Sequence, residues 1–310
     1  MRLIVLFSGQ GHQTPAHRDE AAAGLGAALR ATADAALAPS APSLAALQDD
    51  QLHDNRAAQV LIWSLQWVRW QALQALGVRP TLLAGYSAGE TAAFTAAGWW
   101  SAEAGLRLAA ERARLMSEVT GALGEPAGMW AVTGCDAAPL AAALSGLRAH
   151  VAIRLAAAQT VVAGLESDLK QLAARLAGLG GVQVSRLAVT VPAHTPLLAP
   201  VRAPWQALLE SVAVATGTPA LTLLSGTRAA PVRDREGAIA ALAEQVCTPI
   251  AWNDCLEAMA EYQPDAVLEL GPGSALARMA LARGWPCPVR AVDDFRSPAA
   301  VAEWLARCAP

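Results

Sequence analysis

The chain has 310 residues, of which 54% are hydrophobic and 16% charged, and its formal net charge is −3. This composition indicates a globular protein with a large core and excludes a disordered chain. Dense Lys/Arg runs and long charge-free apolar runs are absent from the sequence, so neither nucleic acid nor a membrane is an expected partner. The five cysteines lack C-x-x-C spacing, which indicates reduced thiols and a cytoplasmic protein without a metal site.

The first predicted element is a buried parallel strand at 3–7, followed by a loop at 8–13. Two glycines free the backbone of this loop and place Gln10 at the carboxyl end of the strand, where the sites of open α/β sheets lie. Helical patterns follow at 19–37 and 55–76.

The helix predicted at 55–76 carries Trp63, Trp67 and Trp70 on one face. Such a stripe predicts a helix that faces the core or a partner rather than a ligand. Gln59 shares this face, and a buried amide needs hydrogen-bond partners. Gln59 is therefore a candidate for lining a polar site.

A G-x-S-x-G pentapeptide at 85–89 lies between an apolar run at 79–84 and a helical pattern at 91–97. In this context the pentapeptide predicts a nucleophile elbow that exposes the hydroxyl of Ser87, although a plain Gly/Ser turn is the alternative. The elbow also places the amide of Ala88 beside that hydroxyl, where an oxyanion would form.

Later segments predict an insert within a larger unit. A helix at 102–117 precedes a loop at 121–126, and the segments beyond it read β-α-β-β-α-β, a ferredoxin-like arrangement. The expected elements of the insert are strands at 128–132, 150–155, 159–163 and 181–189, with helices at 137–144 and 167–176. The elements expected after it are helices at 198–214, 238–246 and 251–262, strands at 220–224 and 266–270, and a final short helix.

These patterns predict an α/β fold. We expect a large α/β-hydrolase-like subdomain with a parallel sheet, built from residues 1–125 and 190–310, and a ferredoxin-like subdomain at 126–189. Clefts between such units are favoured ligand sites.

A serine nucleophile needs a general base. His194 lies in an otherwise apolar, proline-bracketed stretch, where an idle imidazole would be costly to bury, so we predict that it is this base. A satisfied structural histidine is the alternative. Surface or structural roles are expected for the other four histidines, which are His12, His17, His53 and His150.

Five motifs occur together and in order, and they resemble the malonyl-CoA:acyl carrier protein transacylase family from Leu3 to Trp304. They are Gly9-Gln10-Gly11, the elbow from Gly85 to Glu90, Arg112 in its Glu-Arg-Ala-Arg-Leu-Met context, His194, and Gly271-Pro272-Gly273.

The resemblance implies a ping-pong transfer of a malonyl group. Ser87 would attack the thioester of malonyl-CoA with His194 as base, and the backbone amides of Gln10 and Ala88 would hold the oxyanion. The thiol of a carrier protein's phosphopantetheine-type arm would then accept the malonyl group, with no tightly bound cofactor. The main-chain carbonyl of Gln245 would orient His194, in place of the carboxylate of a hydrolase triad.

Arg112 also has a physical reason to lie in the site. A malonyl ester keeps a free carboxylate, and a planar guanidinium pairs with a carboxylate bidentately. The alternative is a surface ion pair of Arg112 with Glu111 or Glu118.

The chain departs from the family pattern in three places. Tyr86 stands where histidine is usual, Ser8 stands where proline is usual, and Arg154 and Leu155 replace an Asn-rich strand. We expect these changes to alter local packing and the positioning of the acyl chain, not the proton transfer.

Two features resemble one branch of the family, the epsilon subunit of malonate decarboxylase. They are the Gly-Tyr-Ser elbow and the tail at 292–297 with Trp304 and Leu305. That branch charges a small carrier subunit that bears a phosphoribosyl-dephospho-CoA group. A fatty-acid or polyketide transacylase is the alternative, since the site residues would be the same.

Two other classes compete with a transferase. A serine hydrolase of the α/β-hydrolase class would need an acidic triad member between Ser87 and His194 in the chain, and no acidic residue there stands at the end of a predicted strand. An inactive scaffold would be expected to lack Ser87 or His194.

Overall fold

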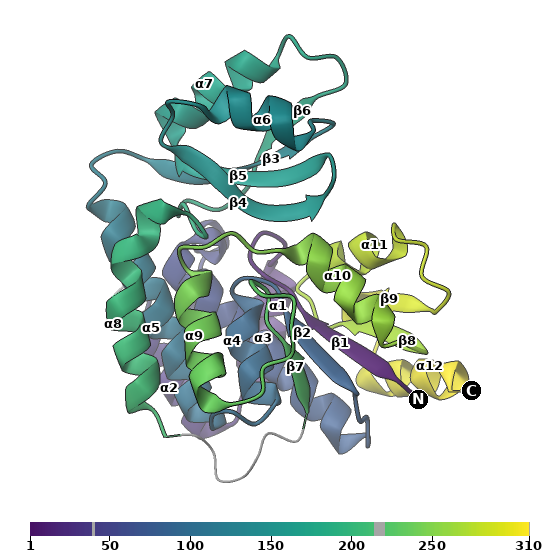
Figure 1. The fold of residues 1–310 in the computed structure, drawn as a ribbon. Helices are drawn as coiled ribbons and strands as arrows, with labels where there is room; N and C mark the ends of the chain where they lie inside the picture. The colour runs from purple at the N-terminus through teal and green to yellow at the C-terminus, as the bar shows by residue number, and fades with distance from the viewer. Residues whose placement is uncertain (39–40, 214–220, 310) are drawn as a thin grey trace.

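The computed structural model describes residues 1–38, 41–213 and 221–309 (Figure 1). It contains a five-stranded parallel sheet and a separate four-stranded antiparallel sheet, which stands above the larger unit in Figure 1. The predicted fold class, an α/β protein with a parallel sheet and a second antiparallel subdomain, is confirmed.

The parallel sheet has the strand order β7-β2-β1-β8-β9. Its strands are β1 (Leu3–Phe7), β2 (Leu82–Gly85), β7 (Thr222–Leu224), β8 (Ala266–Glu269) and β9 (Val289–Ala291). Phe7 pairs with Gly85 and Leu6 pairs with Glu269. The carboxyl ends of β1, β2 and β8 therefore meet at one edge, where the loops that follow them lie side by side.

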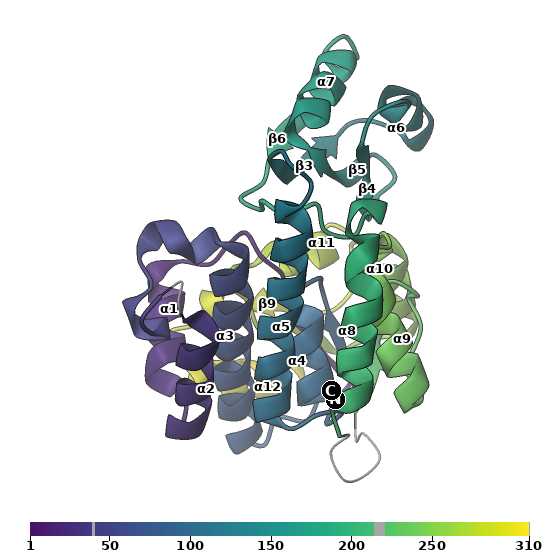
Figure 2. The same cartoon turned by 90° about the vertical axis from the view of Figure 1, so that its left-hand side faces the viewer.

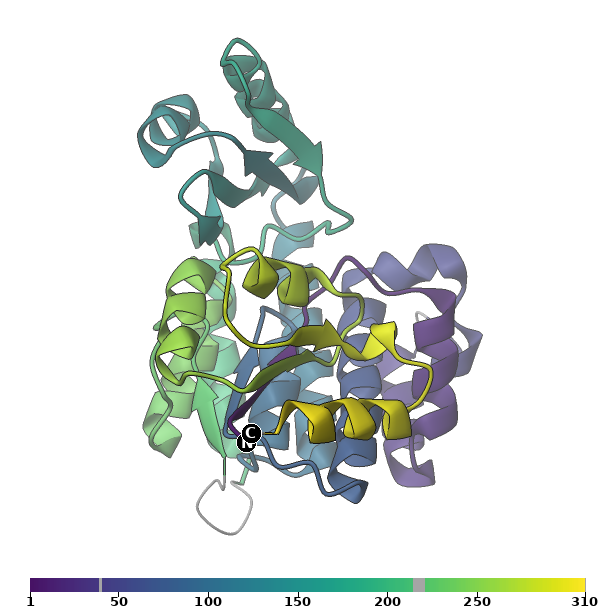
Figure 3. The same ribbon diagram turned by 90° about the vertical axis from the view of Figure 1, so that its right-hand side faces the viewer.

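Helices cover both sides of this sheet. Figure 2 shows α2, α3, α5 and α8 side by side, and Figure 3 shows α12 on another side of the unit. The helices of the large unit are α1 (Pro15–Gly24), α2 (Ala27–Leu37), α3 (Asn55–Ala75), α4 (Gly89–Ala96), α5 (Ala102–Gly121), α8 (Ala199–Ser211), α9 (Arg235–Gln245), α10 (Trp252–Glu261), α11 (Ala275–Leu281) and α12 (Pro298–Cys308). Short 3-10 helices lie at Leu44–Ala46, Asp49–His53, Pro196–Leu198 and Val292–Asp294. Among the described residues, no helix is long and apolar enough to cross a membrane.

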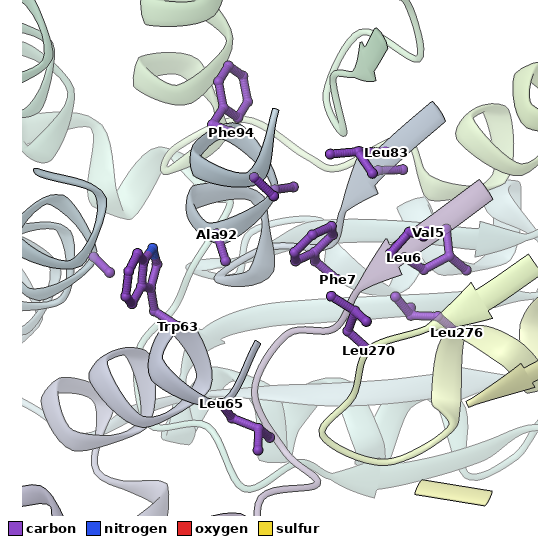
Figure 4. Close-up of a cluster of buried hydrophobic side chains, with 14 of the residues drawn as sticks. Val5, Leu6, Phe7, Trp63, Leu65, Leu83, Ala92, Phe94, Leu270 and Leu276 are labelled. Atoms are coloured by element: carbon purple, nitrogen blue, oxygen red, sulfur yellow. The ribbon is translucent and has the colours of Figure 1, made fainter. Parts of the chain in front are cut away.

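The core of the large unit lies between the sheet and these helices (Figure 4). Phe7, Leu83 and Leu270 are fully buried, and each such side chain contributes about 1.5–3 kcal/mol to the free energy of folding. Trp63 and Trp70 are also buried, while Trp67 is half-buried and stacks on Trp63. Two of the three tryptophans therefore belong to the core, as predicted for a core-facing helix.

The second sheet has the order β4-β5-β3-β6, which is the strand order of a ferredoxin-like unit. Its elements are β3 (Ala127–Thr133), α6 (Ala137–Leu144), β4 (Ala149–Ala156), β5 (Gln159–Leu165), α7 (Glu166–Leu176) and β6 (Gln183–Arg186). Val132, Leu140 and Leu172 belong to a hydrophobic cluster that is separate from the core of the large unit. The small unit therefore buries its own apolar faces.

One contact joins the two units through their backbones. The amide of Ile250 donates to the carbonyl of Ala152, and the amide of Arg154 donates to the carbonyl of Ile250. Strand β4 is thereby bridged to the segment before α10.

Several element boundaries differ from the prediction. The single helix expected at 19–37 is two helices, and a Cβ on Gly24, the last residue of the first of them, would lie 2.4 Å from Val68. The small residue thus lets the end of α1 approach α3. The strand expected at 181–189 covers only 183–186, and β9 and α12 were not predicted. The strand expected at 220–224 is observed at 222–224, and its expected first residue lies outside the described residues. The helix expected at 198–214 ends at Ser211, and its expected last residue also lies outside the described residues.

Candidate active site

The elbow after β2 is a tight turn whose geometry needs its two glycines. Ser87 has a φ of 55°, a conformation that L residues rarely adopt. A Cβ on Gly85 would lie 2.2 Å from Cα of Glu90, and a Cβ on Gly89 would lie 2.3 Å from the carbonyl oxygen of Phe7. The turn therefore packs directly on β1 and on α4, which holds Ser87 at the strand edge.

His194 lies against the hydroxyl of Ser87. Its Nε2 is 2.7 Å from Oγ of Ser87, and its Nδ1 is 2.5 Å from the main-chain oxygen of Gln245. A carbonyl only accepts hydrogen bonds, so Nδ1 carries the proton and Nε2 is left to accept the hydroxyl proton. His194 also has a positive φ, 63°, and strained backbone of this kind clusters at functional sites.

The electrostatic environment keeps this imidazole neutral. Burial, with the charge of Arg112 as a second cause, lowers the pKa of His194 to about 3. The ring is therefore in the neutral form, with Nε2 free to accept a proton, that a general base requires at neutral pH.

Arg112 lies on α5 and is buried, although its position in the sequence allowed a surface ion pair. Its two terminal nitrogens donate to Oε1 of Gln59 at 2.7 Å and to Oε1 of Gln245 at 2.6 Å. Burial lowers the pKa of Arg112 to about 10, so the guanidinium stays charged at neutral pH. Glu111 and Glu118 instead pair with Arg114, which contradicts the alternative of an ion pair with Arg112.

Gln245, the last residue of α9, contacts every other part of this arrangement. Its main-chain carbonyl accepts from His194, and its side-chain oxygen accepts from Arg112. Its side-chain nitrogen donates to the main-chain oxygen of Ser87 at 2.9 Å and to a carboxylate oxygen of Glu90. The sequence predicted only the contact between the main chain and the histidine.

The loop after β1 closes the other side of the site. A Cβ on Gly9 would lie 2.9 Å from the carbonyl oxygen of Tyr86 and 3.4 Å from Cβ of Ser87. The amide of Gln10 follows Gly9 in this loop, and that of Ala88 directly follows Ser87 in the elbow. These neighbouring segments are the ones from which the sequence predicts the two oxyanion donors.

The departures from the family pattern have local explanations. Tyr86 packs edge-on against Trp252, with ring centroids 5.0 Å apart. Ser8 donates a 2.6 Å hydrogen bond to the buried carboxylate of Glu269. Leu155 is half-buried and Arg154 is exposed.

Two site residues were missed by the sequence reasoning, Glu90 and Asn55. Glu90 is fully buried on the first turn of α4, and its other oxygen accepts from the amide of Gly226 at 2.9 Å. Asn55 accepts from Gln59 at 2.9 Å and so supports the residue that holds Arg112. Glu90 had a usable signal, because it is the only charged residue between 80 and 102.

Burial raises the pKa of Glu90 to about 7, against the opposing effect of its hydrogen bonds from Gly226 and Gln245 and of the charge of Arg112. Glu90 does not contact His194, whose Nδ1 binds a carbonyl instead. The acid–histidine pair that a hydrolase triad needs is therefore not formed in this site.

A hydroxyl, a neutral imidazole and a buried cation thus meet at the carboxyl edge of a parallel sheet. This arrangement can remove the proton of a serine hydroxyl and hold an acyl group on its oxygen, which is the chemistry of acyl transfer.

The comparisons with known proteins agree with this class. The family model described as "Acyl transferase domain" matches residues 5–285. The chain is 31% identical over 248 residues to the malonyl CoA-acyl carrier protein transacylase of Mycobacterium tuberculosis, covering 79% of this chain and 80% of that protein.

Solved structures show the same likeness. The crystal structure of the Mycobacterium tuberculosis MCAT has a TM-score of 0.86 at 28% identity and covers 97% of this chain and all of that one (100%). The malonyl-CoA:acyl carrier protein transacylase of Xanthomonas oryzae has a TM-score of 0.85 at 26% identity, with 99% of both chains covered. The chain belongs to the acyl transferase domain family and is an acyltransferase.

Proposed function

We propose that the protein moves a malonyl group from malonyl-CoA to the thiol of an acyl carrier protein, through an ester on Ser87. The family membership supports acyl transfer, and the names of the relatives support this donor and acceptor. The residues around Ser87 supply the reasons for the order of the steps and for the choice of acyl group.

The observation that carries the proposal is the buried guanidinium of Arg112. Two amide oxygens hold it, and its Nε–H has no partner among the described residues. No carboxylate within residues 1–38, 41–213 and 221–309 forms an ion pair with it. A buried cation without a direct counterion favours a ligand that brings an anion, and the free carboxylate of a malonyl group is such an anion.

In the first step Ser87 attacks the thioester carbonyl while Nε2 of His194 takes its proton. The amides of Gln10 and Ala88 would hold the developing oxyanion. The C–S bond then breaks, the proton passes from His194 to the leaving thiolate, and CoA departs as a thiol. Arg112 holds the malonyl carboxylate throughout.

In the second step the carrier's thiol gives its proton to His194 and attacks the ester of Ser87. The C–O bond breaks, and the proton returns from His194 to the serine oxygen. Because burial keeps His194 neutral, its Nε2 is free to accept a proton in both half-reactions.

Two classes of carrier compete as the acceptor, a fatty-acid or polyketide carrier and the malonate decarboxylase carrier. The curated relative reported above is named for transfer to an acyl carrier protein, which favours the alternative of a fatty-acid or polyketide carrier. The Gly-Tyr-Ser elbow and the tail at 292–297 favour the malonate decarboxylase carrier. In the structure, Asp293 of this tail binds His17 and the amide of Gly273, so the tail is part of the packed fold.

Malonyl transfer from malonyl-CoA to purified fatty-acid, polyketide and malonate decarboxylase carriers, each with its own prosthetic group, tests the proposal. The carrier with the highest kcat/KM identifies the role. Absence of malonyl transfer to all three, with a folded enzyme, would contradict the proposed function.

A further inference from the structure

We propose that Glu90 is a positioning residue that acts through Gln245. It fixes the side-chain amide of Gln245 in the orientation that offers an oxygen to Arg112, and it thereby sets the preference for an acyl group with a carboxylate. This inference rests on the proposed malonyl transfer.

Within the described part of the chain, both carboxylate oxygens of Glu90 accept hydrogen bonds. One oxygen accepts from the amide of Gly226 at 2.9 Å, and the other accepts from the side-chain nitrogen of Gln245. Both groups are fixed, because Gly226 lies just beyond β7 and Gln245 ends α9. Glu90 itself is fully buried and lies three residues after Ser87.

These contacts decide which way the amide of Gln245 points. Arg112 can only donate, and an ionised Glu90 can only accept. The amide oxygen must therefore face Arg112, at 2.6 Å, and the amide nitrogen must face Glu90. With the amide turned over, an N–H₂ group would face the guanidinium, and an oxygen would face both the carboxylate of Glu90 and the main-chain oxygen of Ser87, so all three contacts would be lost.

The reaction at Ser87 does not depend on this amide in the same way. His194 binds the main-chain carbonyl of Gln245, which is fixed by the end of α9. A turned amide would therefore disturb the hold on Arg112 more than the proton transfer. The expected signature is a lost preference for malonyl over acetyl groups, with acetyl transfer largely kept.

If Glu90 acted through its charge alone, its loss would raise the preference for malonyl over acetyl groups instead of lowering it. Its negative charge weakens the positive potential that Arg112 offers to an anion, so neutralising it would strengthen malonyl binding. The two roles therefore differ in the sign of the effect.

The decisive experiment measures kcat/KM for malonyl-CoA and acetyl-CoA in the Glu90→Gln variant. This change keeps the size of the side chain but sets an N–H₂ group against Gly226 or Gln245, both of which donate. We expect the malonyl-to-acetyl ratio to fall roughly tenfold, which is the effect of about one hydrogen bond. An unchanged or raised ratio would overturn the proposal.

Glu269→Gln is the matched control. Glu269 is as buried as Glu90 and also accepts two hydrogen bonds, from Ser8 and Ala277, but it does not contact Gln245. Loss of this carboxylate should leave the malonyl-to-acetyl ratio at the wild-type value. An equal fall in both variants would mean that the Glu90 effect is a general loss of stability, and the proposal would be wrong.

A double-mutant cycle tests whether Glu90 acts through Gln245. Gln245→Leu should lower the ratio by itself, and Glu90→Gln should then lower it no further. Additive effects on the ratio would contradict the proposed route.

The pH dependence of the malonyl-to-acetyl ratio in the wild type is a further test of the proposal. Arg112 on α5, Cys255 on α10 and, beyond Gln245, His194 surround Glu90. Burial lowers the pKa of His194 to about 3 and that of Arg112 to about 10, and it raises that of the Cys255 thiol. Among these groups only Glu90, with a pKa of about 7, titrates near neutral pH.

Protonation weakens Glu90 as an acceptor, since hydrogen bonds to ionised groups are roughly twice as strong. The malonyl-to-acetyl ratio should therefore fall as the pH is lowered through about 7, and Glu90→Gln should remove this dependence. A ratio that stays flat in the wild type would contradict the proposal. A wild type that forms no malonyl-enzyme at any pH would instead refute the proposed function on which the inference rests.

Discussion

Strands β2 and β8 flank β1 on opposite sides, and a buried glutamate lies near the carboxyl end of each: Glu269 is the last residue of β8, and Glu90 lies on the first turn of α4, after the elbow that follows β2. Burial raises the pKa of both Glu90 and Glu269 to about 7. Their partners differ. Glu269 binds the hydroxyl of Ser8 and the amide of Ala277, near the start of α11, whereas Glu90 binds the side chain of Gln245, which contacts Arg112 and Ser87.

This difference in partners gives the two buried carboxylates different roles. At β8 the carboxylate ties a loop to a helix, so its loss should appear in stability. At β2 the carboxylate contacts a side chain that also contacts the candidate site, so its loss should appear in substrate preference. The surroundings, rather than the residue type, decide which property depends on the carboxylate.

The largest expected effect is on acylation of the protein, and it should distinguish Ser87, in the elbow after β2, from Ser8, which binds Glu269 at the end of β8. Ser87→Ala should abolish labelling of the protein by radiolabelled malonyl-CoA, because the acyl-enzyme ester needs its oxygen. Ser8→Ala should still be labelled, at a reduced rate, since Ser8 only supports the loop through Glu269. Equal labelling of the wild type and Ser87→Ala would contradict the mechanism.

The next effect concerns the cation beside the β2 end. Arg112→Ala should lower kcat/KM for malonyl-CoA roughly 100-fold, since a bidentate charge-assisted contact contributes ~3 kcal/mol. Transfer of acetyl groups should be kept or increased, because acetyl has no carboxylate to hold. Steady-state kinetics with both donors measures the change, and an unaltered malonyl rate would refute the carboxylate role of Arg112.

The smallest effect is on stability at the β8 end. Glu269→Gln should lower the free energy of unfolding by ~1–3 kcal/mol, because a buried N–H₂ group would replace an acceptor oxygen beside Ser8 or Ala277. Urea denaturation measures this change. A variant as stable as the wild type at every pH would contradict the structural role of Glu269.

The same variant should show a defined pH dependence. Because the pKa of Glu269 is raised from 4.5 to about 7 in the folded protein, its contribution to stability is present below about pH 4.5 and is lost as the pH rises through 7. The deficit of Glu269→Gln should therefore shrink between pH 5 and pH 8. Contributions from Glu90 and His194 are common to both proteins and cancel in this difference.

The sequence predicted the candidate catalytic residues best where a reactive side chain lies in a local pattern that fixes the backbone around it. Ser87 lies in a pentapeptide whose glycines are required by close backbone contacts. The apolar residues on either side of His194 in the sequence predict a buried imidazole, and the side chain is buried. The two residues are 107 positions apart, and they meet because the loop between β6 and the 3-10 helix at Pro196–Leu198 returns the chain from the small unit to the elbow.

Other features could not be found in this way. Glu90 was set aside because it does not stand at the end of a strand, although its isolation among uncharged residues was visible. The side-chain contacts of Gln245 depend on how α9 packs against the elbow, which no local pattern encodes. Strand β9 has three residues and too short a pattern to detect.

The backbone bridge at Ile250 has a mechanical consequence. The small unit is joined to the large one by two covalent connections, which lie above α5 and α8 in Figure 1, and by the pairing of β4 with the segment before α10. A body attached at two points can rock about the line between them, and a third attachment away from that line removes this freedom. The small unit is therefore held at three places rather than two, which restricts its rotation relative to the large unit.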